Sequence, residues 1–490
     1  MAEFTLKEIA SAVGGLAINR TGIKDESITI SGVCTDSRAV EPGNLFVALV
    51  GEHFDGHQFC KEVSDKGGKV FMISREACLP EQSVGIIVPD TLKAYQDLAK
   101  YRRKRLGCKV IAVTGSVGKT STREMIALAM ASSYRTHVTT ANNNNEIGLP
   151  STILAAPEDT EIIVLEMGMR QLGEIRVLTG IAAPDIAVVT NIGVSHIELL
   201  GSRESILAAK MEICEGLGPE GILIINGDDP FLSGYVSEPS NRRWRQLAAA
   251  AWTAKSCETL QTDFCVHADR MVMSETGTSF DAVIVDDKQT EQTISLRIRA
   301  TGRHHIKNAM ISIMCARFAG VDPESACLAL QNYHPMSGRG KIIQTKRFTV
   351  CDDAYNASPE SMMAAFENVA MISGARRKIA AIGGMLELGG YASELHYEIG
   401  AGAAESGIDC IYVCGEFAEK VREGALSVRP GIPVKVFADR DQLTDVLIGD
   451  LLPYDVLLCN ASHSFRFDLV SEAIIRLDGG PISVEKEERS

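Results

Sequence analysis

Apolar residues recur along this chain in two kinds of spacing. Short runs rich in Val, Ile and Ala, at 109–114, 161–165, 185–190 and 221–225, alternate with stretches whose apolar positions recur at helical spacing. This alternation predicts β-α-β units that build a parallel sheet. The segment 260–300 instead alternates apolar and polar residues one by one, which predicts a small antiparallel addition.

The pattern also predicts three α/β domains, because 490 residues are too many for one hydrophobic core. We expect a small domain at 1–107, a central parallel-sheet domain at 108–332 and a Rossmann-like, doubly wound domain at 333–490. The first domain begins with a short helical pattern at 6–13. Near its end, the basic run 102–105 is expected to be a solvated hinge.

The most distinctive local pattern is the stretch VIAVTGSVGKTST at 110–122. A β-branched run breaks into a glycine turn, and a predicted helix follows. Backbone N–H groups of such a turn can cradle phosphate oxygens, while Lys119 supplies a positive charge and Thr120 a hydroxyl for Mg²⁺. Val113 stands where a strict Walker A motif has glycine, and a glycine-rich turn with a surface lysine is the simpler alternative. The candidate phosphate-binding residues are Gly115, Ser116, Gly118, Lys119, Thr120 and Ser121.

Composition narrows the class of protein. The 49 basic and 63 acidic residues leave a formal charge of −14, which disfavours a nucleic-acid partner. No run approaches about 18 uninterrupted apolar residues, so we expect no membrane span, and the N-terminus lacks the apolar core of a signal peptide. The 13 cysteines contain no C-x-x-C pair and indicate neither a zinc site nor a complete disulfide framework. A cytoplasmic protein in a reducing compartment is the expectation.

Three further polar residues follow strands predicted in the central domain. Glu166 ends a strand at the edge where open α/β sheets bind ligands, and beside a phosphate loop its carboxylate is favoured as a Mg²⁺ ligand over a solvated strand end. His196 lies in the loop after the next strand, and Lys210 lies two turns into a helix that Ser202 can cap. From the residues alone, a structural histidine and a solvated lysine are the ordinary interpretations.

Other polar segments fit nucleotide binding and ordinary turns equally well. They are the asparagine run 142–145, the segment GRHHIKN with Asn308, the segment SGRG with Arg339, and the segment DDAYNASP with Asp353 and Asn356. Amide and carboxylate groups of this kind can contact a base, a ribose or a metal ion. None of these segments decides the function alone.

Together, these segments resemble the Mur ligase family, the ATP-dependent amide-bond-forming enzymes of peptidoglycan synthesis. The resemblance covers nearly the whole chain and rests on TDSRAVEPGNLFVALVGEHFDGHQF, TTANNNNEIGLP and DDAYNASPESM. The last segment is most similar to members that add D-alanyl-D-alanine to UDP-N-acetylmuramoyl-tripeptide. The resemblance implies these two substrates, ATP and Mg²⁺ as cofactors, and an acyl phosphate intermediate. We expect a monomer.

The resemblance also implies roles for individual residues. Those implied in catalysis are Lys119, Lys210, His196 and Arg339, with Lys210 as a carbamylated lysine. Those implied at metal ions are Thr120, Glu166, His196 and Lys210. Beyond the phosphate loop, those implied at the nucleotide are Asn308, Arg339, Asp353 and Asn356, with Asn308 against the adenine. Those implied at the other substrates are Thr35, Asp36, Ser37 and Arg38 on the UDP-sugar side, and Thr139, Thr140, Tyr355 and Ser462.

Three positions depart from the family's usual pattern. Gly384 replaces an aspartate, His305 replaces an asparagine, and CNASHS at 459–464 replaces K-G-S-R. Two of them lie in the third domain, which selects the amine, so a related Mur or folate-type ligase with a different amine remains an alternative. A non-catalytic paralogue that binds nucleotide or UDP-sugar is another, and a P-loop kinase would leave the TDSR segment unexplained. The third residue of the acceptor peptide and the general base stay open.

Overall fold

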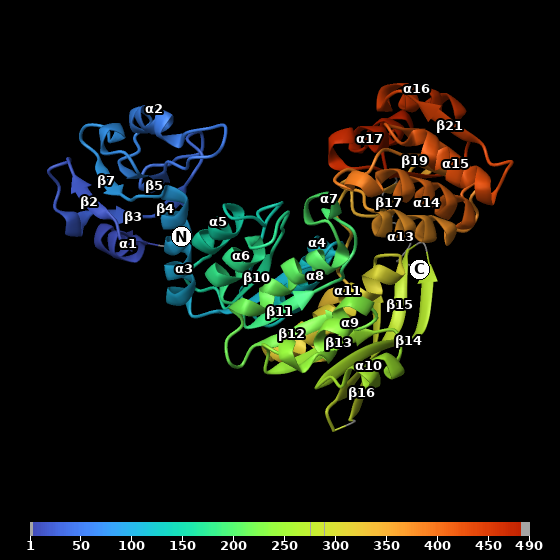
Figure 1. Ribbon diagram of the computed structural model, residues 1–490, viewed down its shortest axis with the longest axis horizontal. Coiled ribbons are helices and arrows are strands. Elements are labelled where there is room, and N and C mark those ends of the chain that lie inside the picture. Colours follow the sequence, from blue (N-terminus) through green and yellow to red (C-terminus); the bar gives the residue numbers. More distant parts are fainter. Residues whose placement is uncertain (1–2, 275, 289, 482–490) are drawn as a thin grey trace, which may run out of the picture.

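The computed structural model describes residues 3–274, 276–288 and 290–481. Within these ranges the strands form four sheets, which group into three successive bodies along the chain (Figure 1). The first body and the third body lie on either side of the central body. This is the α/β class with mostly parallel sheets that the sequence predicts.

The first body carries a five-stranded sheet in the order β2-β7-β6-β5-β4, in which only β2 is antiparallel to its neighbour. Its strands are β2 (Leu16–Asn19), β4 (Gly32–Cys34), β5 (Asn44–Val47), β6 (Val70–Ile73) and β7 (Val84–Ile87), with a two-stranded pair of β1 (Phe4–Thr5) and β3 (Thr29–Ile30). Helix α1 (Leu6–Val13) begins at a capping box, because the Thr5 hydroxyl accepts from the Glu8 N–H and the Glu8 carboxylate accepts from the Thr5 N–H. Helix α2 spans Cys60–Asp65.

Helix α3 (Thr91–Leu106) joins the first body to the central body, and the solvated hinge expected at 102–105 is wrong for Arg102 and Arg103, whereas Lys104 and Arg105 are exposed. Arg102 is fully buried, and its guanidinium donates to the Ala156 carbonyl at 2.7 Å and to Glu158. Arg103 donates to the Ala182 carbonyl at 2.9 Å. Basic residues in a last helical turn face either solvent or a neighbouring domain, and only the tertiary structure decides between the two.

The central body carries a nine-stranded sheet in the order β16-β15-β14-β13-β12-β11-β8-β10-β9. Its strands are β8 (Lys109–Thr114), β9 (Thr136–Val138), β10 (Ile162–Glu166), β11 (Ile186–Val189), β12 (Ile222–Asn226), β13 (Gln246–Ala251), β14 (Phe264–Ser274), β15 (Gly277–Asp286) and β16 (Glu291–Ile298). Its helices are α4 (Lys119–Ala131), α5 (Gly148–Ala155), α6 (Glu174–Ala182), α7 (Ile197–Leu200), α8 (Arg203–Met211), α9 (Pro230–Ser237), α10 (Ala254–Leu260), α11 (Arg303–Ala319) and α12 (Pro323–Leu330). Strands β14, β15 and β16 pair antiparallel, which confirms the predicted addition.

The third body carries a six-stranded sheet in the order β17-β18-β22-β19-β20-β21, parallel except for β17. Its strands are β17 (Lys341–Gln344), β18 (Thr349–Asp352), β19 (Lys378–Ile382), β20 (Cys410–Cys414), β21 (Val434–Phe437) and β22 (Val456–Asn460). Its helices are α13 (Pro359–Ala370), α14 (Ala392–Glu405), α15 (Ala418–Val428), α16 (Arg440–Asp450) and α17 (Asp468–Leu477). The turn η6 (Gly389–Tyr391) packs against α7 of the central body.

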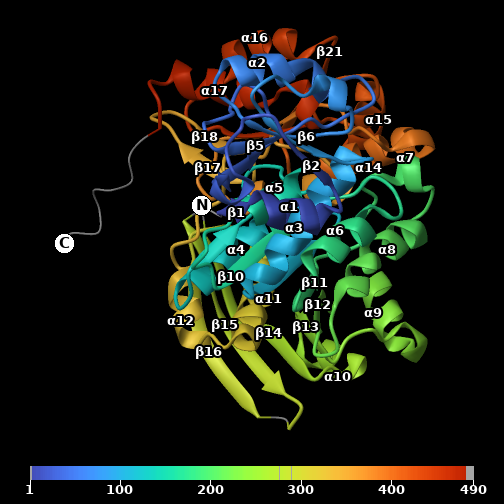
Figure 2. The ribbon, with the colours of Figure 1, turned by 90° about the vertical axis from the view of Figure 1, so that its left-hand side faces the viewer.

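Two further features are a disulfide and the absence, among the described residues, of a helix that could span a membrane. Cys257 and Cys265 form a disulfide with 5.8 Å between their Cα atoms, a pair that the cysteine spacing did not predict. Among the described residues, no helix combines the length and the apolar character needed to cross a membrane. The view in Figure 2 shows the first and third bodies above the central sheet, with α11 and the β14–β16 strands below them.

Candidate active site

A cavity of about 1210 Å³ lies where the central body meets the third body. The central body contributes the loop before α4 and the loops that follow β10 and β11. The third body contributes the segment around Arg339 and the start of α13. Because the carboxyl ends of parallel strands meet at one edge of a sheet, both sheets direct their loops into this cavity.

The predicted phosphate loop connects the end of β8 at Thr114 to the start of α4 at Lys119. Gly118 has φ 81°, and Gly115 has φ 151° with an added Cβ 1.9 Å from the Thr190 hydroxyl, so both positions require glycine. No side chain caps the N-terminus of α4, which leaves its N–H groups available for an anion. The Lys119 ammonium donates to the carbonyls of Gly115 at 2.8 Å and Ser116 at 3.1 Å.

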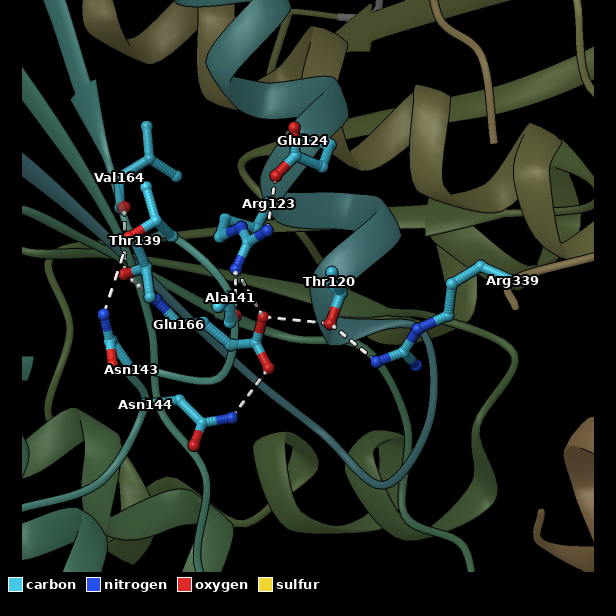
Figure 3. A network of polar contacts seen from close by, with 11 residues as sticks. Thr120, Arg123, Glu124, Thr139, Ala141, Asn143, Asn144, Val164, Glu166 and Arg339 are labelled. Carbon is cyan, nitrogen blue, oxygen red and sulfur yellow. Dashed lines mark hydrogen bonds and ion pairs between the residues drawn. The ribbon is translucent and has the colours of Figure 1, made fainter. Parts of the chain in front are cut away.

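Glu166 is the centre of a buried polar network at the end of β10 (Figure 3). One carboxylate oxygen accepts from the Thr120 hydroxyl at 3.0 Å and from the Arg123 guanidinium at 3.1 Å, and the other accepts from the Asn144 amide at 2.9 Å. The Glu166 N–H donates to the hydroxyl of Thr139, a predicted substrate residue, at 3.1 Å. The structure therefore brings Glu166 and Thr120, both predicted metal ligands, into direct contact.

His196 and Lys210 lie close to the same loop. His196 is the residue that precedes α7, has the left-handed φ of 65°, and lines the cavity. Lys210 is only 2% exposed, and among the described residues no carboxylate forms an ion pair with it. Burial, assisted by the charge of Lys119, holds the pKa of Lys210 well below its usual value. Lys210 is therefore not the solvated surface charge that its spacing alone suggests.

The third body reaches the phosphate loop through Arg339. Its guanidinium donates to the Thr120 hydroxyl at 3.3 Å and stacks 3.8 Å from the centre of the Tyr355 ring. Desolvation raises the pKa of Asp353 to about 8, although the nearby charge of Arg339 acts against the rise. The Asn460 amide donates to Asp353 at 2.9 Å, and Asn356 lines the cavity beside them.

Asn308, Lys307 and Trp252 line another part of the cavity. Asn308 is buried on α11 with its amide oxygen facing Gly118, and its amide nitrogen has no hydrogen-bond partner among the described residues. The ammonium of Lys307 lies 4.3 Å from the Trp252 ring centre. An unsatisfied buried amide donor is a suitable partner for an acceptor atom of a planar heterocycle, and the half-buried Trp252 lines the same cavity.

Some predicted substrate residues lie outside this cavity. Thr35, Asp36, Ser37 and Arg38 belong to the first body, where Arg38 and Asp36 form an ion pair with 2.7 Å between the charged groups. Thr140 accepts from the Asn143 amide at 3.5 Å, and the buried Ser462 hydroxyl accepts from the Leu386 N–H at 3.0 Å.

Sequence reasoning missed three polar residues of the site, Arg123, Glu360 and Glu387, and named Asn144 only as part of the asparagine run 142–145. Arg123 and Asn144 hold Glu166, while Glu360 and Glu387 reach from the third body to the loop after β11. Arg123 could have been found from sequence, because it lies three residues after Thr120 on the same helix. Glu360 lies in the segment DDAYNASPESM, but the contacts of both glutamates could not be found from sequence, since their partners are more than 160 residues away.

The departure at Gly384 has a steric cause. A Cβ added at Gly384 would lie 2.7 Å from the Phe465 ring, and that ring also lies against Gly383 and Gly415. The Phe465 ring thus occupies the space that an aspartate at 384 would need.

Gly384→Asp is expected to lower the free energy of unfolding by about 1 to 3 kcal/mol, because the new side chain overpacks against Phe465. Phe465→Ala in the same chain should recover part of this loss, measured by urea unfolding. Gly390→Ala is the matched control, since nothing lies within 4 Å of a Cβ there. Equal unfolding midpoints for Gly384→Asp and the unmodified chain would contradict the steric explanation.

Models of three protein-family domains match this chain in succession. The one described as "Mur ligase family, catalytic domain" matches residues 29–103, "Mur ligase middle domain" matches 113–316, and "Mur ligase, glutamate ligase domain" matches 338–463. Each match falls within one of the three bodies of the structure.

Similar whole proteins carry related names. The Bacillus subtilis protein named UDP-N-acetylmuramoyl-tripeptide–D-alanyl-D-alanine ligase is 37% identical over 97% of this chain and 99% of its own length. The Escherichia coli protein of the same name is 31% identical over 90% and 91%.

Solved structures agree with these relatives. The UDP-N-acetylmuramoylalanyl-D-glutamyl-2,6-diaminopimelate–D-alanyl-D-alanyl ligase of Acinetobacter baumannii superposes with a TM-score of 0.82, at 27% identity over 97% of this chain and 99% of its own. The MurF ligase of Thermotoga maritima in complex with ADP gives 0.77, at 27% identity over 90% and 96%. With three domain matches in order and relatives similar over almost the full length, this chain belongs to the Mur ligase family of ATP-dependent ligases.

Proposed function

We propose that this chain joins D-alanyl-D-alanine to UDP-N-acetylmuramoyl-tripeptide, with conversion of ATP to ADP and phosphate. The supporting observation is the single contact network in which Arg339 of the third body meets Thr120 of the phosphate loop and Glu166. Such a network supports a reaction in which the third body delivers the amine to a phosphate group held by the loop before α4, because both line one cavity. The full-length relatives named as ligases of these two substrates support the same reaction.

The reaction proceeds in two displacement steps. An oxygen of the tripeptide carboxylate attacks the γ-phosphorus of ATP, the bond to the β,γ-bridging oxygen breaks, and ADP leaves. Lys119 and the N–H groups at the start of α4 stabilise the charge that develops on the phosphate oxygens. The amine of the dipeptide then attacks the acyl carbon, phosphate leaves with the electron pair of the C–O bond, and the amine loses a proton. Arg339 and the third body exclude water from the acyl phosphate.

We assign the three bodies separate substrates. Residues 1–107 would bind the UDP-sugar through Thr35, Asp36, Ser37 and Arg38, and residues 108–332 would bind ATP. Residues 333–490 would bind the amine, with Tyr355 and Ser462 on its side of the cavity. Arg339, Asp353, Asn356 and Asn308 would contact the nucleotide, and Thr139 and Thr140 would position the acceptor.

The residues present fit Mg²⁺ bound together with the nucleotide. Mg²⁺ prefers one or two carboxylates combined with phosphate oxygens and water, and among the described residues no group of three or more His, Cys, Asp or Glu could enclose a metal alone. Thr120 and Glu166 would hold this ion, and His196 and Lys210 a second position. When bound, Mg²⁺ would neutralise charge on the phosphate groups.

Lys210 would serve as a carbamate. Its lowered pKa favours the neutral amine, whose nitrogen attacks the carbon of CO₂ and releases one proton to solvent. The resulting carbamate carries anionic oxygen atoms that can bind a metal ion. The unmodified amine of Lys210 would bind the same ion only weakly. ATP and a UDP-linked acceptor are reactants of the cytoplasm, so we infer that the chain acts there. We also propose that it acts as a monomer.

A ligase with a different amine is the second candidate, because Gly384 and the segment 459–464, which includes Asn460, depart from the usual pattern at the end of the third sheet. It predicts the same ATP chemistry with another acceptor for the acyl group.

The test is phosphate release from Mg²⁺-ATP with UDP-N-acetylmuramoyl-tripeptide, with and without D-alanyl-D-alanine, with the product mass measured. We expect amine-dependent release and a product enlarged by the dipeptide, with lysine-containing and diaminopimelate-containing tripeptides compared in parallel. Release only with another amine from a panel of D-amino acids and dipeptides would establish the second candidate. No release with any amine, while ATP still binds, would contradict both.

A further inference from the structure

Glu387 of the third body contacts two loops of the central body. It lies in the loop between β19 and η6, and one of its carboxylate oxygens is 2.5 Å from Nδ1 of His196 in an ion-pair contact. The other oxygen is 3.4 Å from the guanidinium of Arg170. Its backbone carbonyl accepts from the Glu198 N–H at 3.2 Å.

The two contacted loops flank the phosphate loop. Arg170 follows β10, His196 follows β11, and these two strands are the neighbours of β8 in the central sheet. One carboxylate therefore contacts the loops on both sides of β8, the strand that leads into the phosphate loop and Lys119.

The backbone at this contact is unusual on both sides. Glu387 has φ 62° and His196 has φ 65°, and neither is glycine. Left-handed backbone in such residues costs free energy and persists where surrounding contacts hold it, most often at functional sites. A Cβ at Gly389 would lie 3.1 Å from the Glu198 side chain, so the two loops pack closely here.

A second carboxylate of the third body reaches the same central loop. Glu360, at the start of α13, accepts from the Val194 N–H at 2.9 Å. A Cβ at Gly193 would lie 2.5 Å from the Glu360 carboxylate, so this contact requires glycine at that position. The loop that carries His196 is thus held by the third body at two points.

We propose that Glu387 is a positioning residue that fixes the orientation and tautomer of His196 when the third body docks on the central body. The Glu387 carboxylate lies at ion-pair distance from Nδ1 without the geometry of a hydrogen bond, so it acts through its negative charge, which favours a proton on that nitrogen and leaves the Nε2 lone pair free. ATP chemistry is thereby linked to docking of the domain that delivers the amine. The expected effect on kcat rests on the proposed function. The expected effect on the His196 tautomer rests only on the contact between Glu387 and His196.

The first test is kinetic and uses Glu387→Ala and Glu387→Gln in the full-length chain. Loss of an outer partner of a functional histidine typically costs 10- to 100-fold, so we expect kcat to fall by about 10²-fold in the alanine variant with the KM for ATP nearly unchanged. The glutamine variant keeps the size of the side chain but lacks its negative charge, so it should recover little of this loss. Glu394→Ala, an exposed carboxylate on α14, is the matched control.

A double-mutant cycle shows whether Glu387 acts through His196. In a His196→Ala background, Glu387→Ala should lower kcat by less than about 2-fold, because the group it positions is already gone. An undiminished loss in that background would overturn the proposal, and so would an unchanged kcat in Glu387→Ala alone.

The second test is independent of the amine. Nitrogen-15 NMR of histidine-labelled protein reports which ring nitrogen carries the proton, and His196→Ala identifies the signal. We expect the Nδ1–H form in the unmodified chain and a mixture in Glu387→Ala. A mixture already in the unmodified chain would overturn the proposal. If the chain forms no product with D-alanyl-D-alanine, the proposed function fails while this measurement still decides the role of Glu387.

Discussion

Lys119→Ala should lower the rate of ADP formation by about 10³-fold, the largest kinetic effect expected from a single side chain here. Lys119 provides a positive charge within the phosphate loop, and its ammonium is held between the carbonyls of Gly115 and Ser116. Burial lowers the pKa of Lys119, and the negative charge of Glu166 acts against that fall. The lysine is therefore close enough to interact with Glu166, the carboxylate that we assign to Mg²⁺. Steady-state kinetics with a coupled ADP assay measures the loss.

Two variants control this result. Lys119→Arg keeps the charge but carries a planar group that cannot enter the space between the two carbonyls, so we expect its activity to stay within about 10-fold of the alanine variant. Lys420→Ala, an exposed lysine on α15 paired with Glu423, should leave the rate unchanged. Near-normal ADP formation by Lys119→Ala would contradict the phosphate-loop assignment.

Lys210→Ala should lower ligation by about 10²-fold or more, and a short carboxylic acid such as formate should restore part of the activity. Lys210 is buried and lies near Lys119, and its pKa is lowered by burial and by that neighbouring charge. The neutral amine is the form that reacts with CO₂, and a lowered pKa increases the fraction of this form. Added formate supplies the carboxylate that the missing carbamate would have provided.

A direct observation separates the carbamate from a structural role. Carbon-13 NMR of the unmodified chain in labelled bicarbonate should show one carbamate signal that is absent from Lys210→Ala. Thermal unfolding of the variant checks that the cavity left by the lysine has not unfolded α8. Full activity in Lys210→Ala, or a variant that folds normally but shows no response to formate, would reject the carbamate.

Much of the fold was predictable because period and turn chemistry are local properties. The β-branched run at 109–114 and the turn at 115–118 specify β8, the glycine turn after it and the start of α4, and the structure confirms all three elements. Ser202 caps α8 as its position predicts, since its hydroxyl accepts from the Ser205 N–H. Arg102 and Arg103 of the basic run 102–105 were misjudged because their partners, Ala156 and Ala182, lie more than 50 residues along the chain.

The sequence by itself determined the class of the fold, the phosphate loop and the identity of the chemical groups available. These follow from residue types at short spacing, where the backbone has few alternatives. Only the tertiary structure decided that Lys210 is buried, that Arg339 meets Thr120, and that Glu387 contacts His196. Each of these three features depends on how whole sheets pack. Packing sets the distances, the desolvation and the charges around a side chain, and the neighbouring residues in the sequence do not encode those quantities.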